Sequence, residues 1–191
     1  CDQALLDYIT SDKGTIFPHI LLNNIDLVNQ NFNKKDMISK NKKKWYSNKY
    51  SIKTRLKNLY LSPLNNFSGI KWHHLPVPYL KSTLEDSWSL YYDSLDKTSK
   101  NKFRSITDVN QYVFRNHQLV NGNFSPYNVD ALGKFYNLPH LLENFEQDLN
   151  NDSYKIYCIK DSDEIEDFDK VKTKVIDLLD RKLPNKSSFE N

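Results

Sequence analysis

The stretch "YKIYCIKDSDEIEDFDKVKTKVIDLLDRK", Tyr154 to Lys182, decides the class of fold that we predict. Its first seven residues alternate β-branched and aromatic side chains, which is typical of a strand. The remainder has its acidic residues first and its basic residues last, as the dipole of a helix favours. Four apolar side chains share one face of that helix: Phe168, Val171, Val175 and Leu178. A strand, an acidic turn and a helix form a unit of an α/β sheet, in which ligands usually bind at the carboxyl ends of the strands.

Upstream of this unit the sequence predicts helices separated by turns. Residues 18–32 repeat apolar side chains at i, i+4, i+7 and i+11, with Asn and Asp on the other side. The apolar face consists of Leu21, Ile25, Val28 and Phe32. Further helices are expected over residues 34–46 and 51–61. The chain as a whole therefore predicts a helix-rich α/β protein with a small sheet.

Two capping boxes predict two more helix starts, because a Ser and an acid three residues later can close the first helical turn. Ser82 with Glu85 predicts a helix that continues through Tyr92. Ser105 with Asp108 predicts a second one, which Asn121-Gly122 ends. The apolar face of the second helix would be Val109, Tyr112, Val113 and Val120.

Composition limits the classes of partner. The chain has 191 residues, 38% of them hydrophobic, and 27 basic against 24 acidic residues leave a net charge of +3. That charge is too small to demand a nucleic acid or a membrane as partner. Cys1 and Cys158 do not make a disulfide framework, so we expect a reducing compartment, the cytoplasm. The chain does not start with Met, and we expect it to be a piece of a longer polypeptide.

The most basic run is "KNKKKW", Lys40 to Trp45. A charge run of this kind is usually the solvated face of a helix. The alternative is attraction to an anionic membrane surface or to a polyanionic product. The second reading would give a protein that associates peripherally with the inner face of the plasma membrane.

Two adjacent histidines in "KWHHLPVPYL", Lys71 to Leu80, are the first candidate for chemistry. His73 and His74 follow an extended segment and precede a turn that Pro76 and Pro78 restrict. A side chain that titrates near neutrality suits a general base at such a position. The alternative is that one or both histidines only hydrogen-bond within the fold. A zinc site is weaker, because the other histidines show no ligand spacing.

Arg104, in "KTSKNKFRSITDVN" from Lys97 to Asn110, is the second candidate. It would stand directly before the helix that Ser105 and Asp108 cap, and an arginine beside a helix N-terminus binds anions such as phosphate. The alternative is a surface arginine paired with Asp108.

The carboxylates of "CIKDSDE", Cys158 to Glu164, are the third candidate. They follow the predicted strand and could hold a divalent cation through oxygen ligands, or could only cap the last helix. An EF-hand is excluded, because its sixth and twelfth loop positions would be Glu166 and Lys172 instead of Gly and Glu.

Taken together, these segments resemble a known family. "HHLPVPYLKSTLEDSW" (73–88), "TSKNKFRSITDVNQY" (98–112), "YKIYCIKDSDE" (154–164) and the ending "LPNKSSFEN" look like the third and fourth sequence blocks of the Stealth family. These are bacterial capsular polysaccharide phosphotransferases, similar to the catalytic part of the animal N-acetylglucosamine-1-phosphotransferase. "FPHILLNNIDLVNQNF" (17–32) looks like the stretch between the second and third blocks, so the resemblance covers nearly the whole chain.

The resemblance implies transfer of a sugar 1-phosphate from a nucleotide sugar to a hydroxyl of a polysaccharide, with release of the nucleoside monophosphate. It assigns the base to His74 and the phosphate-binding arginine to Arg104. Asp108 would cap its helix and hold Arg104, and Asp161 would meet the donor or its metal. A divalent cation, with magnesium the expected ion, commonly helps such a phosphate to leave.

The resemblance also implies the architecture. Residues 1–68 would link to an absent nucleotide-sugar half, residues 69–150 would carry the H-L-P and F-R-x-x-x-D motifs, and residues 151–191 would form a strand-helix block. The chain would then be the C-terminal part of a Rossmann-like nucleotide-sugar transferase domain. Lys160 departs from the family pattern, which usually has Asn there, and this departure weakens the case for a metal at that position. With the first block and most of the second absent, we expect this piece to be inactive alone.

Two other classes remain open at the level of the sequence. One is a helical module that binds a polyanion or polysaccharide through its basic run and aromatic side chains without catalysis. The other is a metal-dependent phosphodiesterase that uses the paired histidines.

Overall fold

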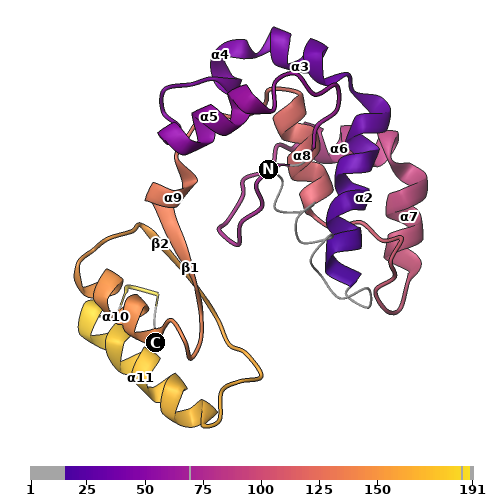
Figure 1. Ribbon diagram of the computed structural model, residues 1–191. Coiled ribbons are helices and arrows are strands. Elements are labelled where there is room, and N and C mark those ends of the chain that lie inside the picture. Colours follow the sequence, from indigo (N-terminus) through magenta and orange to yellow (C-terminus); the bar gives the residue numbers. More distant parts are fainter. Residues whose placement is uncertain (1–15, 69, 186, 190–191) are drawn as a thin grey trace. The chain divides into compact units, whose positions relative to one another are not determined.

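The structure is a computed structural model that describes residues 16–68, 70–185 and 187–189. These residues form two compact units (Figure 1). The helical unit comprises the described residues up to Trp72 together with Pro76–Asn128. The sheet unit comprises His73–Leu75 and the described residues from Val129 onward. The segment with the two histidines thus contributes to the sheet unit, although its flanks belong to the helical one.

The helical unit is built around one central helix, α8 (Tyr112–Val120), against which α2, α3 and α6 pack. Nearly all of its side chains are buried, including four consecutive polar ones from Arg115 to Gln118. Because buried polar groups need partners, this helix binds other segments through its side chains. The other helices of the unit are α2 (Ile16–Asn31), α3 (Lys34–Lys40), α4 (Lys42–Trp45), α5 (Ile52–Tyr60), α6 (Lys81–Leu90) and α7 (Tyr92–Lys100).

The predicted apolar face of the first helix is confirmed. Leu21, Ile25 and Val28 of α2 are buried, and Phe32, directly after the helix, packs against the same core. The prediction that its asparagines lie on the solvated side is wrong for Asn24, which is fully buried. Its amide is satisfied by Asn110, whose backbone N–H and side chain both bond to it. A buried amide is tolerated when its hydrogen bonds are made within the protein.

Two predicted helices are each divided in the structure. The helix expected over residues 34–46 is interrupted at Asn41, whose side chain lies against Gly122, a residue with φ of +75°. A Cβ at Gly122 would come within 2.3 Å of the Asn41 side chain, so a larger residue does not fit there. The helix expected to continue through Tyr92 ends at Leu90, because Tyr91 turns into the core with only 3% of its surface exposed.

Neither predicted capping box starts a helix. The N-cap of α6 is Leu80, whose backbone N–H donates to the side-chain oxygen of Gln118 at 2.9 Å. A side chain from α8 thus binds the backbone at the helix start, two residues before Ser82. The helix predicted to open at Ser105 begins only at Tyr112.

The sheet unit contains a parallel pair of strands, β1 (Gly133–Asn137) and β2 (Ile156–Lys160), joined through α10 (Leu142–Asn150) (Figure 1). The short helix α9 (Val129–Leu132) precedes β1, and α11 (Phe168–Lys182) follows β2. One face of the sheet packs on α10 and α11 through a core of Tyr136, Phe145, Leu149 and Leu178. The predicted strand is confirmed over Ile156–Lys160 and the predicted helix over Phe168–Lys182, but residues 161–167, expected to begin that helix, lie outside it. Helix α10 was not predicted.

The coarse fold class is confirmed: the described part of the chain is helix-rich, with a small parallel sheet. None of the described helices is both long and apolar enough to cross a membrane. The three-part division based on sequence blocks remains a prediction.

Candidate active site

The imidazole of His74 lies on the open face of the sheet. Its ring stacks on the ring of Phe135 in β1, with 4.4 Å between the ring centroids and 26° between the planes. Side chains alternate along a strand, so Phe135 points away from the face that Tyr136 packs on the helices. His74 itself stays exposed to solvent at its other side. A ring held by stacking and open to solvent can meet a substrate.

The glycine at the start of β1 makes room for Leu75, the residue that follows His74. Leu75 is buried, and its Cδ2 would lie 2.9 Å from a Cβ placed on Gly133. The same Cβ would come within 2.5 Å of the carbonyl oxygen of Ile156. Only glycine leaves room for Leu75 at the start of β1. Leu75 thus packs against Gly133 and His74 against Phe135, and these two residues lie on the same face of β1.

The charge of Lys160 acts on His74. Burial of the ring and the positive charge of Lys160 both lower the pKa of His74 from its ordinary value. Lys160 is the last residue of β2 and pairs in register with Asn137, the last residue of β1. A lowered pKa keeps the imidazole neutral near pH 7, which is the form that accepts a proton.

The carboxyl ends of both strands carry polar groups that can meet a ligand. The side-chain oxygen of Asn137 is buried and has no hydrogen-bond partner in the described part of the chain. Asp161 directly follows β2 and is exposed. Ser162 donates to the carbonyl of Leu138 at 2.6 Å, which ties the two strand ends together. The structure therefore brings His74, Lys160 and the ends of β1 and β2 into one region, and Asp161 is adjacent to it in sequence.

Helix α8 holds the flanks of the histidine segment. The guanidinium of Arg115 donates to the carbonyl of Lys71 at 2.6 Å. Gln118 donates to the carbonyl of Pro78 at 3.1 Å and accepts from the N–H of Leu80. The residues before and after the pair of histidines are thus anchored by hydrogen bonds to a buried helix.

Arg104 lies in an irregular loop of the helical unit, not beside a helix N-terminus as predicted. The helix that was expected to begin at Ser105 is α8, which begins at Tyr112, well beyond Arg104. The loop is held by α2 instead: the Asn23 amide donates to the carbonyls of Ile106 and Asp108 at 2.8 and 2.9 Å. Arg104 is exposed, and no ion pair to it is found within the described residues. Its guanidinium is therefore available to an anion.

Asp108 was predicted to cap a helix and to hold Arg104 in place; the helix cap is wrong, and no ion pair between the two side chains is found among the described residues. Its carboxylate is buried and accepts from the backbone N–H of Ser105 at 2.8 Å and from the Asn101 amide at 2.6 Å. These two donors satisfy the charge within the loop. Asp108 shapes the backbone that carries Arg104 instead of pairing with its side chain.

His74 belongs to the sheet unit and Arg104 to the helical unit, so their approach to one phosphoryl group remains a prediction. Sequence reasoning missed Gly133, Phe135 and Asn137, because the stretch that contains them carries none of the motifs discussed above. It noted Lys160 as a departure from a pattern but did not connect it with His74. That connection depends on strand register, which a single sequence does not reveal.

A divalent cation does not fit the described residues as a ready-made site. No group of three or more His, Cys, Asp or Glu side chains able to hold a metal occurs among them. Cys158, in the middle of β2, is a free thiol.

Comparison with known proteins confirms the resemblance drawn from the sequence. Capsular polysaccharide phosphotransferase WcwK of Streptococcus pneumoniae is 39% identical over 189 residues, covering 99% of this chain and 56% of the relative. Receptor polysaccharide phosphotransferase WefC of Streptococcus gordonii is 33% identical, with 98% of this chain and 55% of the relative covered. Exopolysaccharide phosphotransferase cps2G of Lactiplantibacillus plantarum is 31% identical, with 91% and 51% covered.

Over nearly its whole length the chain is thus similar to bacterial polysaccharide phosphotransferases, in agreement with the resemblance drawn from the sequence. It spans about half the length of the curated relatives it matches. No protein-family model and no solved structure matches it.

Proposed function

We propose that this chain supplies the base and part of the phosphate site of a polysaccharide phosphotransferase. In the whole protein, a sugar 1-phosphate would pass from a nucleotide sugar to a hydroxyl of a capsular or other cell-surface polysaccharide. The observation that carries the proposal is the stacking of the His74 imidazole on Phe135, where burial of the ring and the charge of Lys160 lower the pKa of His74. A proton acceptor beside a fixed positive charge is the pair that this reaction requires.

The proposed step begins at the acceptor hydroxyl. His74 takes its proton as the hydroxyl oxygen attacks the phosphorus that bears the sugar. A new P–O bond to the acceptor forms, the bond to the oxygen bridging the two phosphates breaks, and the nucleoside monophosphate departs with that oxygen. The product is a phosphodiester link, and His74 later gives its proton to solvent.

Cationic side chains would offset the charge that builds on the phosphoryl oxygens. Arg104 is suited to this task because a guanidinium can bind two oxygens at once and the loop beneath it is fixed by Asn23 and Asp108. Lys160 supplies a point charge next to His74. Asp161, exposed after β2, would contact the donor or its metal.

The proposed reaction includes a divalent cation, with magnesium the expected ion, that supports departure of the leaving phosphate. Because the described residues hold no ready group of three or more ligands, the donor phosphates would supply part of its coordination, with Asp161 as a candidate ligand. No step assigned to His74 depends on it.

The proposed architecture is a Rossmann-like domain to which this chain contributes its C-terminal part. The support is physical: parallel sheets occur almost only as larger sheets covered on both faces. Here the described strands pair only with each other, and each residue of β2 is at least partly exposed. Strands from the part of the polypeptide that the relatives have in addition would extend this sheet.

The test is kinetic and uses the complete protein. His74→Ala and Arg104→Ala should each lower transfer by about 100-fold or more, the usual scale for a general base or an oxyanion donor. His140→Ala and Arg181→Ala are matched controls, because both side chains are exposed and belong to surface ion pairs. Release of nucleoside monophosphate from a panel of nucleotide sugars is the measurement.

Near-normal turnover in His74→Ala or Arg104→Ala would remove the corresponding role. His73→Ala should have the milder effect, because we assign that neighbour to the fold. A loss of transfer in all variants, controls included, would instead indicate a general defect in folding, which circular dichroism detects.

A further inference from the structure

Helix α5 (Ile52–Tyr60) is amphipathic, but its orientation is the reverse of that of an ordinary surface helix. Its polar side faces the protein. Thr54 and Asn58 are partly buried, and the Asn58 amide donates to the carbonyl of Trp45 at 2.9 Å. Ser51 caps the helix by accepting from the backbone N–H of Thr54 at 3.2 Å. The helix is thus attached through hydrogen bonds, and none of its residues is fully buried.

The apolar side of α5 faces solvent. Residues at i, i+4, i+7 and i+8 form one stripe along a helix. Their exposed fractions are high: Ile52 74%, Leu56 62%, Leu59 62% and Tyr60 81%. Exposure of so much apolar surface on one helix is unfavourable in water, and such a contiguous patch indicates a binding surface.

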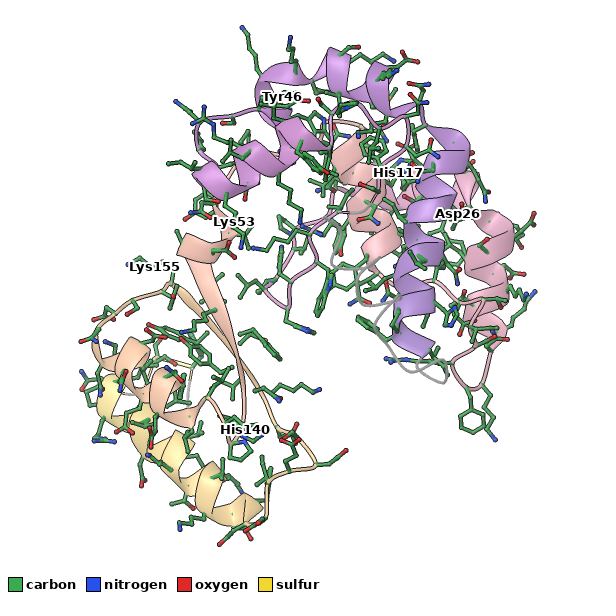
Figure 2. All side chains as sticks on the ribbon, viewed as in Figure 1. Asp26, Tyr46, Lys53, His117, His140 and Lys155 are labelled. Carbon is green, nitrogen blue, oxygen red and sulfur yellow. The ribbon has the colours of Figure 1, made fainter. Side chains whose placement is uncertain are left out.

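Basic residues flank this stripe on both sides. With 3.6 residues per turn, Arg55 borders it on one side and Lys53 and Lys57 on the other. Lys53 is labelled on α5 in Figure 2. The helix contains no acidic residue. Long basic side chains beside an apolar stripe can extend their charges to a polar boundary while their stems cover apolar surface.

The surrounding sequence reinforces this charge. Residues 34–60 contain ten basic residues and one acidic residue, a net charge of +9 in a chain whose total is +3. The rest of the chain is therefore net acidic. The basic run from Lys40 to Lys44 lies shortly before α5 and includes most of the short helix α4.

We propose that α5 lies in the surface of an anionic membrane. The stripe of Ile52, Leu56, Leu59 and Tyr60 would enter the boundary between headgroups and acyl chains, and Lys53, Arg55 and Lys57 would meet lipid phosphates. Tyr60 has the amphipathic ring that is enriched at such boundaries. The inference concerns attachment to a surface and does not depend on the proposed reaction.

The positive charge around the apolar stripe of α5 favours an anionic membrane over a second copy of this chain as its binding partner. The remainder of this chain is net acidic, so a second copy could neutralise the basic residues only by presenting its acidic regions, whereas an anionic membrane offers both negative charge and an apolar interior. Helix α11 differs from α5 in its charge. It also exposes Phe168 and Ile176, but it contains acidic as well as basic residues. An interfacial helix needs both the stripe and the uniform sign of charge that α5 has.

The experiment measures co-sedimentation of the 191-residue chain with vesicles. Phosphatidylcholine vesicles are compared with vesicles that also contain phosphatidylglycerol. The first variant, Ile52→Ser/Leu56→Ser/Leu59→Ser, removes the stripe. The second, Lys53→Gln/Arg55→Gln, removes two charges. The control, Phe168→Ser/Ile176→Ser, alters the exposed apolar residues of α11 by the same chemistry.

We expect binding only to the anionic vesicles, weakened by salt. The triple variant should bind at least tenfold more weakly. Each lost charge should lower the partition coefficient about fivefold, so the double variant should lose about 25-fold. The control should bind like the unaltered chain, and the thermal unfolding temperature should not fall in any variant, because the altered side chains are exposed.

Three results would overturn the inference. They are no binding to anionic vesicles, equal binding to neutral vesicles, and unaltered binding by the triple variant. Absence of vesicle binding together with a change of oligomeric state in the triple variant would assign the stripe to a contact between protein surfaces instead.

Discussion

The imidazole of His74 is tuned by two separate neighbours. Phe135 supplies an apolar ring face that removes water from one side, and Lys160 supplies a like charge. Both effects disfavour the imidazolium form. They come from different strands, so the register of β1 against β2 controls the protonation of a residue that is distant from both in sequence.

Replacement of Lys160 by Gln should raise the pKa of His74, because it removes a positive charge that opposes protonation. An NMR titration of the His74 ring protons measures this directly. In the complete protein the acid limb of kcat/KM should move to higher pH in the same variant. Lys155→Gln, just before β2, is the control and should leave the titration unchanged. An unaltered His74 titration in Lys160→Gln would contradict the coupling.

His117 is a second histidine with a lowered pKa, at the centre of the helical unit (Figure 2). It is buried, its Nδ1 shares a hydrogen bond of 3.1 Å with the Tyr91 hydroxyl, and Phe32 lies edge-on to its ring. Burial lowers the pKa, while Asp86 opposes that shift. The folded state therefore favours the neutral form of the His117 imidazole.

This burial predicts a pH-dependent stability. Below pH 6.5, the ordinary pKa, the unfolded chain takes up a proton at this site more readily than the folded one. Stability should then fall as the pH decreases, by at most about 1.4 kcal/mol per pH unit from this group. Urea unfolding at pH 7.5 and 5.5 measures the difference. His117→Gln should reduce it, and an identical pH dependence in that variant would refute the assignment.

At the scale of elements, α8 anchors the stretches on either side of the histidines, which belong to the same helical unit as α8. Its buried polar side chains replace contacts that apolar residues would make in an ordinary core helix. Arg115 and Gln118 bind the backbone of Lys71, Pro78 and Leu80. This segment has no described secondary structure before α6, so side chains from α8 satisfy its backbone groups.

Gln118→Ala should destabilise the helical unit by about 1–3 kcal/mol, because it leaves the Leu80 N–H and the Pro78 carbonyl without their partner. Chemical denaturation measures the loss, and faster hydrogen exchange at the Leu80 amide localises it. Gln30→Ala is the matched control, since that glutamine is exposed and bonds only to Asp26 within α2. A protected Leu80 amide in Gln118→Ala would show that the anchor is dispensable.

At the scale of the whole molecule, the chain divides its chemistry between two units. The sheet unit holds His74 and Lys160, and the helical unit holds Arg104 and the basic helix α5. The relatives are about twice as long as the matched region. A sheet of two described strands is small for a nucleotide-sugar site.

We therefore expect the 191-residue chain alone to show no transfer of sugar phosphate. The complete protein, assayed with the same nucleotide sugars, should release nucleoside monophosphate, because the strands that extend the sheet would complete the donor site. Measurable turnover by the isolated chain, abolished by His74→Ala, would show that the donor site is already complete within it.

The local predictions succeeded where periodicity and a single element decide the outcome. The buried face of α2 follows from apolar spacing, and β2 and α11 follow from alternation and charge order. The helix starts predicted at Ser82 and Ser105 are wrong because tertiary contacts replace the expected caps. Gln118 binds the N–H of Leu80, and Asp108 accepts hydrogen bonds within a loop that Asn23 holds. Propensity is a weak guide once buried side chains compete for backbone groups.

The sequence by itself determined the similarity to polysaccharide phosphotransferases and the helix-rich α/β class, and it proposed His74 and Arg104 as candidates, because blocks of residues and short-range spacing carry that information. Only the tertiary structure decided that His74 stacks on Phe135 beside Lys160, that Asp108 serves its own loop, and that α5 turns its apolar side outward. Those features depend on the register of the strands and on which hydrogen-bond partner each buried polar group finds. Both are determined by contacts between residues far apart in the chain, which local sequence patterns do not reveal.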